Sequence, residues 1–157
     1  ANPKDIPKSI DYNLALIIIL SLALGTALIK TGMAEIIARF FIKALKPFGA
    51  YGLLAGIFLI TNLLGSYITN KAAAAIMFPI SVTAAIDLAL PTTPFILIVA
   101  FGAAANFITP IGYQTNLMVY GPGGYNFKDY MRIGLPLTVI YLVTSVFLMG
   151  WWYELPL

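Results

Sequence analysis

The stretch "SYITNKAAAAIMFPI" at residues 66–80 places the polar triplet Thr69-Asn70-Lys71 directly before four alanines in a strongly apolar chain. A lysine in such a place is either a loop charge at the membrane surface or a group kept inside the bilayer because it has a function there. The triplet is therefore either a tight turn between two membrane crossings or the tip of a re-entrant hairpin near the bilayer midplane.

Both interpretations of the triplet have physical support. Asn is a good turn former, and residues 50–68 form an apolar window long enough to cross a hydrocarbon layer of about 30 Å. A re-entrant tip instead requires protein or water around its non-helical backbone. It would offer the Thr69 hydroxyl, the Asn70 amide and the free N–H groups of a helix that begins near Lys71. Those groups suit a small cation on one side and an anion on the other.

Composition places the chain in a membrane. The sequence is 61% hydrophobic and 10% charged, its mean hydropathy is +0.92, and soluble domains carry about 25% charged residues. Several windows approach the ~20 residues of a spanning helix, so we expect an all-α membrane protein. The absence of Cys and His excludes disulfides, thiol and imidazole chemistry and His/Cys metal sites. The net charge of +3 is spread without a basic block, which excludes nucleic acid as a partner.

The apolar windows divide the chain into a polar linker and a membrane part. We expect residues 1–12 to be the linker and residues 13–157 to be the transmembrane part, which the family resemblance described below implies to be a C-terminal transport repeat. Because the chain begins without Met on linker-like sequence, we expect either a fragment or a half-size subunit. The positive-inside rule puts the N-terminus and the 122–132 loop in the cytoplasm and the C-terminus outside. The expected elements are a span at 13–30, an amphipathic interfacial helix at 32–49, and further apolar windows at 50–68, 71–90, 93–121 and 133–152.

The window 93–121 is interrupted by a second irregular stretch, "ANFITPIGYQTNLMVYGPGGY" at residues 105–125. Asn106 and Asn116 lie within it, Pro110 removes a backbone donor, and Gly112 permits unusual dihedral angles. The apolar flanks are each too short to span alone, so we predict one broken helix over about 93–121. The alternative is a loop between two short helices. Broken helices are usual places for transporter ion and substrate sites, so we expect the break to face the tip at about 66–71.

The two irregular segments resemble a known family. "ITNKAAAAIMFPI" (68–80) and "TPIGYQTNLMVYGPGGY" (109–125) are similar to the hairpin tip and the broken helix of the divalent anion:sodium symporters. The likeness is greatest to the bacterial permease branch that carries potassium-regulation-type (RCK) domains. It implies sodium-coupled symport of small divalent anions, dicarboxylate or sulfate, across the inner (plasma) membrane. It also implies a multi-pass homodimer of two inverted repeats that move as an elevator. This chain would be the C-terminal repeat, with the N-terminal repeat or a second subunit as partner and its hairpin entering from outside.

The resemblance also implies which residues form the site. The residues matching sodium-binding positions are Ser66, Thr69, Asn70 and Gly112. The residues matching substrate-binding positions, or lying beside them, are Thr69, Asn70, Lys71, Tyr113 and Gln114. The chain departs from the family pattern at Gly65, where a sodium-coordinating hydroxyl is often found, although Ser66 is adjacent.

Lys71 is the second departure, because the family has a small polar residue there. A lysine at the midplane costs about 3 kcal/mol and therefore needs a partner, such as the substrate anion or the space of a bound sodium. Our hypothesis is that Lys71 weakens or replaces one sodium site, which leaves coupling reduced or proton-based. The alternative is that Lys71 extends to the membrane surface.

Three other functions compete with transport. An ion channel can also use a re-entrant loop, but a filter needs rings of carbonyls or charges, which "TNK" beside alanines does not resemble. A structural membrane subunit without transport activity is a further alternative. An intramembrane enzyme is disfavoured because only Asp87 and Glu35 are acidic residues within apolar segments, and nucleophile–base pairs are missing.

Overall fold

The computed structural model describes residues 43–156 and, before them, residues 23, 27, 30–33, 36 and 40. The linker at 1–12, the predicted span at 13–30 and most of the predicted interfacial helix at 32–49 lie outside the described residues. Within 43–156 the regular structure is entirely helical. The all-α class predicted from composition is therefore confirmed for the described part of the chain.

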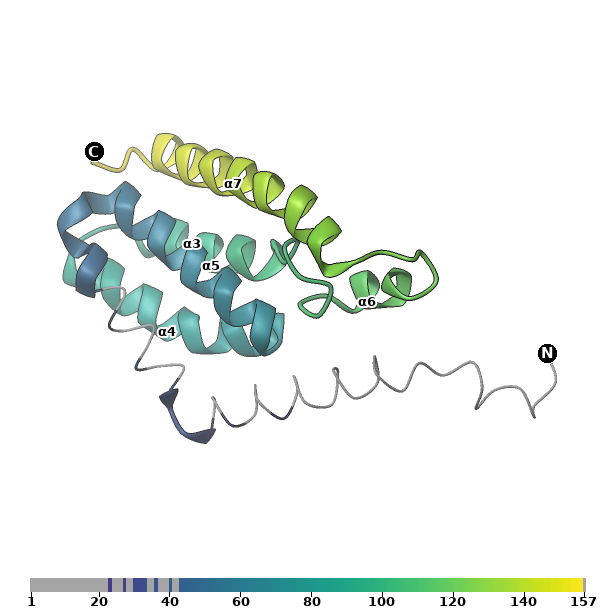
Figure 1. Ribbon diagram of the computed structural model, residues 1–157. Helices are drawn as coiled ribbons and strands as arrows, with labels where there is room; N and C mark the ends of the chain where they lie inside the picture. Colours follow the sequence, from purple (N-terminus) through teal and green to yellow (C-terminus); the bar gives the residue numbers. More distant parts are fainter. Residues whose placement is uncertain are drawn as a thin grey trace.

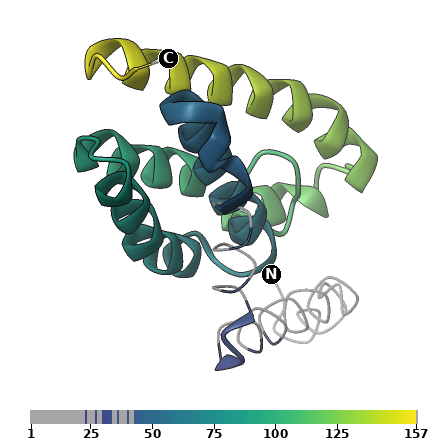
Figure 2. The same cartoon turned by 90° about the vertical axis from the view of Figure 1, so that its left-hand side faces the viewer.

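The described helices form a small bundle in which two helices occupy the middle. Helices α3 and α5 pack against each other, α4 contacts both of them, and α7 also contacts both, while α4 and α7 do not meet. Figure 1 shows α7 along one side and α4 along the opposite side, and the rotated view in Figure 2 agrees. The elements in chain order are the 3-10 turn η3 (Lys46–Phe48), α3 (Gly49–Tyr67), α4 (Asn70–Asp87), α5 (Thr92–Ala104), α6 (Gln114–Tyr120) and α7 (Phe127–Trp152).

The turn between α3 and α4 consists of only two residues, Ile68 and Thr69. The Ile68 N–H still donates to the Leu64 carbonyl at 2.9 Å, so the end of α3 is regular. Thr69 is extended (φ −135°, ψ 154°) and caps α4, because its hydroxyl accepts from the Ala72 N–H at 3.1 Å. Threonine is a preferred N-cap residue for this reason. The polar triplet thus caps and starts α4, directly after the C-cap residue of α3.

The core lies between α3, α4 and α5, and α7 packs against it. Phe58 of α3 is completely buried, and the ring of Tyr141 from α7 lies 5.9 Å from it and 6.1 Å from Phe101 of α5. Gly102 lets α5 approach α3 closely, since a Cβ at this residue would be 2.8 Å from the Phe58 carbonyl oxygen. A small residue at a helix crossing is a common way to pack membrane helices.

Two described helices, α3 and α7, are long and apolar enough to cross a membrane by length and composition. The most apolar window of α3 is 61% buried inside the bundle, whereas that of α7 is 28% buried. The α7 surface consequently presents many large apolar side chains, among them Ile133, Ile140 and Phe147. Such a surface suits contact with lipid.

Helix α7 begins at Phe127 and not at residue 133, where the sequence placed the start of the last span. The reason is a local cap, because the backbone N–H of Asn126 donates to Asp129 Oδ2 at 2.8 Å. The Asp129 carboxylate in the first turn of the helix thereby pairs the backbone N–H of the N-cap residue Asn126. Polar residues therefore belong to the first turns of this helix.

Residues 105–113 separate α5 from α6 and form no helix. Helix α5 ends at Ala104, and the Ala105 N–H still bonds to the Phe101 carbonyl at 3.1 Å. Pro110 lies inside the segment and has no N–H to continue a helix. The predicted interruption is present, and it extends from Ala105 to Tyr113.

Candidate functional site

The side chain of Asn106 lies at the centre of a polar cluster between the α3–α4 turn and the 105–113 segment. Asn106 is 2% exposed and belongs to the non-helical segment that follows α5. A buried carboxamide costs free energy unless its donors and acceptor are paired. In this chain both ends of the carboxamide have partners.

The carboxamide oxygen of Asn106 accepts from two residues of α3. Asn62 Nδ2 lies 3.4 Å from Asn106 Oδ1, and Ser66 Oγ lies 3.3 Å from it. Asn62 and Ser66 are four residues apart on one face of the helix, and both are buried. Asn62 Nδ2 also donates to the Ala105 carbonyl at 2.7 Å, which ties α3 to the end of α5.

The carboxamide nitrogen of Asn106 points toward oxygen atoms from three segments. It donates to Asn70 Oδ1 at the start of α4. The carbonyl oxygens of Ala103 and Gly112 lie 3.4 Å and 3.5 Å from the same nitrogen. The hairpin turn, the end of α5 and the non-helical segment therefore meet at one side chain.

Further hydrogen bonds hold the 105–113 segment in shape. Asn116 of α6 donates from Nδ2 to the Asn106 carbonyl at 3.2 Å and to the Thr109 carbonyl at 3.4 Å. The Gly112 N–H donates to Thr109 Oγ1 at 3.2 Å. These bonds satisfy backbone groups that have no helical partner, as buried non-helical backbone requires.

Three of the four residues predicted for a sodium site contact one side chain, that of Asn106. Ser66, Asn70 and Gly112 each contact the Asn106 carboxamide. The hydroxyl of Thr69 is instead occupied by the Ala72 N–H. Among the described residues there is no group of three or more Asp, Glu, His or Cys, so the oxygen atoms gathered here are neutral. Neutral amide, hydroxyl and carbonyl oxygens fit a monovalent cation.

The residues predicted for substrate lie at the rim of this cluster. Lys71 is exposed in the first turn of α4, and Tyr113 is exposed at the end of the non-helical segment. Gln114 is the first residue of α6. The first N–H groups of an α-helix lack intrahelical partners and favour negative charge, and Lys71 adds a cation at the same end of α4.

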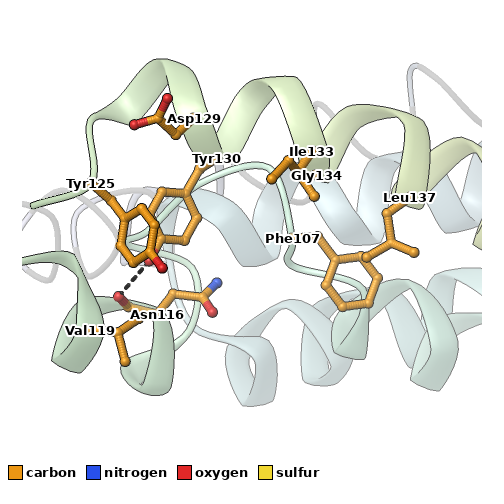
Figure 3. Close-up of a pocket in the computed structure, with 9 residues that line it drawn as sticks. All are labelled: Phe107, Asn116, Val119, Tyr125, Asp129, Tyr130, Ile133, Gly134 and Leu137. Atoms are coloured by element: carbon orange, nitrogen blue, oxygen red, sulfur yellow. Dashed lines mark hydrogen bonds between the residues drawn. The ribbon is translucent and has the colours of Figure 1, made fainter. Parts of the chain in front are cut away.

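A separate cavity of about 360 Å³ lies on the far side of the non-helical segment, against α7. Figure 3 shows its lining residues from the 105–113 segment, α6, the following loop and α7, with the Tyr130 hydroxyl bonded to the Asn116 carbonyl. That bond is 3.0 Å long. None of the predicted site residues lines the cavity, which is bordered by Phe107, Asn116, Val119, Tyr125, Asp129, Tyr130, Ile133, Gly134 and Leu137.

Comparison with known families decides the class of the protein. The family model described as citrate transporter matches residues 1–156. The chain belongs to the CitMHS citrate transporter family. Members of this family are transporters and not enzymes, so the enzyme alternative is excluded. The predicted relationship to the anion:sodium symporters is confirmed, whereas the branch with regulatory domains stays a prediction.

Several curated relatives of this citrate transporter family member are transporters. An uncharacterized transporter of Synechocystis sp. is 41% identical over 138 residues, which are 88% of this chain and 22% of that protein. A probable sodium/sulfate cotransporter 3 of Chlamydomonas reinhardtii is 35% identical over 90% of the chain, and a sodium/sulfate cotransporter 1 of that organism is 34% identical over 90%. The chain spans 16% of the length of each of these two cotransporters. No solved structure matches the chain.

Sequence reasoning missed two members of the polar cluster in this citrate transporter family member. Asn62 was not singled out, and Asn106 was considered only as a residue that interrupts an apolar window. Both are polar side chains in apolar segments, which is itself a signal of function in a membrane protein. What the sequence did not show is that Asn62 and Asn106, 44 positions apart, touch each other.

Proposed function

We propose that this chain is one of two inverted repeats of a sodium-coupled carrier for small divalent anions of the sulfate or dicarboxylate class. The complete carrier is a homodimer in the inner membrane, crosses it several times and moves its substrate as an elevator. Family membership supports transport, and the relatives named sodium/sulfate cotransporters support this ion and this class of anion.

The observation that carries the proposal is the meeting of Asn70 and Gly112 at one buried side chain. Asn70 Oδ1 belongs to the first residue of α4, next to the α3–α4 turn, and the Gly112 carbonyl belongs to the non-helical segment; both accept from Asn106 Nδ2. Irregular backbone inside a membrane is tolerated where it is surrounded by protein or lines a cavity. Two such places that share a contact fit the ion sites of secondary transporters. The sodium ligands we propose are Ser66, Thr69, Asn70 and Gly112.

The substrate anion is proposed to bind beside the sodium, at the start of α4. The exposed Lys71 ammonium and the first N–H groups of α4 are the positive groups at this end of the helix. Tyr113 and Gln114 follow the break and are proposed to border the anion, together with Thr69 and Asn70.

The hairpin formed by α3 and α4 is proposed to enter the membrane from outside. With 19 residues, α3 is about 28 Å long at the rise of an α-helix. A tip inside the hydrocarbon layer therefore requires α3 to be tilted or to begin outside that layer. The 3-10 turn with Pro47 and the exposed Phe48 precedes α3, which is compatible with a start in the headgroup region.

The direct test of the proposed function is uptake of labelled sulfate and of labelled dicarboxylates into vesicles that contain the complete transporter. We expect saturable uptake that follows an inward sodium gradient and is lost when choline replaces sodium. Substrate flux at carrier rates together with sodium dependence supports symport. Ion conductance far above carrier turnover, or no flux of any tested anion, would contradict it.

Lys71 is expected to set the sodium dependence of uptake. If the ammonium replaces one sodium, Lys71→Thr will make the dependence on sodium concentration steeper, while Lys71→Arg keeps the charge and the shallow curve. Anion affinity should also fall in Lys71→Thr, by roughly tenfold for a lost charged hydrogen bond of about 1.5 kcal/mol. The measurement is uptake over a sodium titration at fixed anion. Identical steep curves for the native chain and for Lys71→Thr would refute this role.

A further inference from the structure

Asn106 connects the start of α4 to the non-helical segment through its carboxamide, beside the bond from Asn62 of α3 to the Ala105 carbonyl. Its oxygen accepts from α3 and its nitrogen donates to Asn70 and lies near the Gly112 carbonyl. Among the side chains of the described residues, Asn106 is the one that touches every part of the polar cluster. Its loss would therefore separate the two irregular places without removing either.

Two glycines make room for this side chain. A Cβ at Gly65 of α3 would lie 2.7 Å from Asn106 Nδ2, and a Cβ at Gly112 would lie 3.1 Å from Asn106 Cβ. Any other residue at Gly65 would collide with the carboxamide of Asn106. The carboxamide of Asn106 therefore fills the space that Gly65 leaves because it has no side chain.

The nitrogen of Asn106 is a hydrogen-bond donor placed among oxygen atoms that a cation would need. Asn70 Oδ1 and the Gly112 carbonyl oxygen cannot direct the same lone pairs at a donor N–H and at a metal ion. The oxygen end of the same carboxamide faces two donors of α3, Asn62 Nδ2 and the Ser66 hydroxyl, which shares its one proton with the Asn62 carbonyl at 2.9 Å. The group is thus fixed with its donor end toward the hairpin tip.

We propose that Asn106 is a latch that holds the hairpin tip against the non-helical segment and competes with sodium for the oxygens of Asn70 and Gly112. This inference rests on the proposed function for the identity of the cation. A sodium ion that uses the lone pair on which the Asn106 amide hydrogen lies must displace the contact between Asn106 and Asn70 before it binds. The apparent sodium affinity is then the intrinsic affinity multiplied by the fraction of molecules in which the latch is open.

Removal of the latch is expected to improve sodium binding, which a merely structural residue would not do. In the complete transporter, Asn106→Ser shortens the side chain and removes the carboxamide nitrogen that donates to Asn70. Release of one competing hydrogen bond of about 1 kcal/mol corresponds to a roughly fivefold lower sodium concentration at half-maximal uptake. A higher half-saturation in Asn106→Ser, or an unchanged one, would overturn the competition.

The opening of the hairpin tip can be measured independently of transport, as the rate at which a thiol at the tip is labelled. The chain has no cysteine, so Ile68→Cys places a single thiol at a turn residue that is 8% exposed. Labelling of this thiol in sodium-free buffer should become about fivefold faster when Asn106→Ser is added, because the tip opens more often. Ala50→Cys, 3% exposed at the other end of α3, is the control. Equal acceleration at both positions would indicate general loosening and overturn the latch.

The steric match offers a rescue experiment. Gly65→Ser alone should collide with Asn106 and reduce uptake, whereas Gly65→Ser combined with Asn106→Ser should recover it, because the shorter side chain leaves space for the new hydroxyl. Residues in contact give non-additive effects in such a cycle. Additive effects of the two substitutions would show that Gly65 and Asn106 act separately, against the proposal.

These measurements separate the latch from the proposed function. Faster labelling of Ile68→Cys in the Asn106→Ser background, without any sodium-dependent uptake, would keep the latch and refute sodium symport. Sodium-driven uptake with unchanged labelling and unchanged half-saturation would keep symport and refute the latch. Lower half-saturation together with faster labelling supports both.

Discussion

Asn70→Ala is expected to lower sodium-driven anion uptake by about 5- to 150-fold in kcat/KM. The substitution removes the side-chain oxygen that the α3–α4 turn contributes to the polar cluster, and with it the acceptor for Asn106 Nδ2. A buried donor left without its partner costs about 1–3 kcal/mol, and each 1.4 kcal/mol is a factor of ten. The effect should be opposite in sign to that of Asn106→Ser, because Asn70 is proposed as a sodium ligand as well as a latch partner, whereas Asn106 is not proposed as a ligand.

The measurement for Asn70 is initial uptake over a range of sodium and anion concentrations. Thr93→Ala is a suitable control, since Thr93 is an exposed polar residue in the first turn of α5, at the opposite end of that helix from the polar cluster. Surface expression and helix content should match the native chain in both variants. Native uptake by Asn70→Ala would favour a structural membrane subunit over a carrier.

Gly102→Val is the second substitution with a large expected effect, and it acts on folding. The new Cβ would lie 2.8 Å from the Phe58 carbonyl oxygen and 3.0 Å from Thr61 Cβ. A backbone carbonyl cannot move aside as a flexible side chain can, so α5 must separate from α3. Overpacking of this kind costs about 1–3 kcal/mol, and it also displaces the end of α5 that Asn62 holds.

The matched control for Gly102→Val is Ala104→Val, two residues further along the same helix at an exposed position. It adds a β-branched side chain of the same type without a packing conflict. We expect a lower midpoint of thermal or denaturant unfolding in detergent for Gly102→Val and little change for Ala104→Val. Equal midpoints for the two variants would mean that α3 and α5 are further apart than the structure shows.

Many features of the protein follow from local chemistry and could be read from the sequence. The low charge and high hydropathy require a non-aqueous environment, and the chain bears this out with its long apolar helices. Thr69 can cap a helix through its own hydroxyl, so the turn at the triplet was visible as a pattern. Pro110 cannot donate a backbone hydrogen bond, so the interruption after α5 was visible too.

The start of α7 shows where local pattern falls short. The apolar window suggested residue 133, but the interaction between Asn126 and Asp129 begins the helix earlier. Hydropathy reports the part of a helix that lipid can surround, whereas a helix begins where its first N–H groups find acceptors. The two boundaries differ whenever the first turns are polar.

What only the tertiary structure decided is the polar cluster around Asn106. Nothing local to Asn62, Gly65 or Asn106 indicates that they meet, because their contact depends on how α3 crosses α5 at Gly102. A carboxamide makes directional bonds within about 3 Å, so a shift of one helical turn would join different residues. The sequence alone determined that this chain belongs in a membrane and where its helices break. The packing of those helices determined which polar groups from the two breaks share one site.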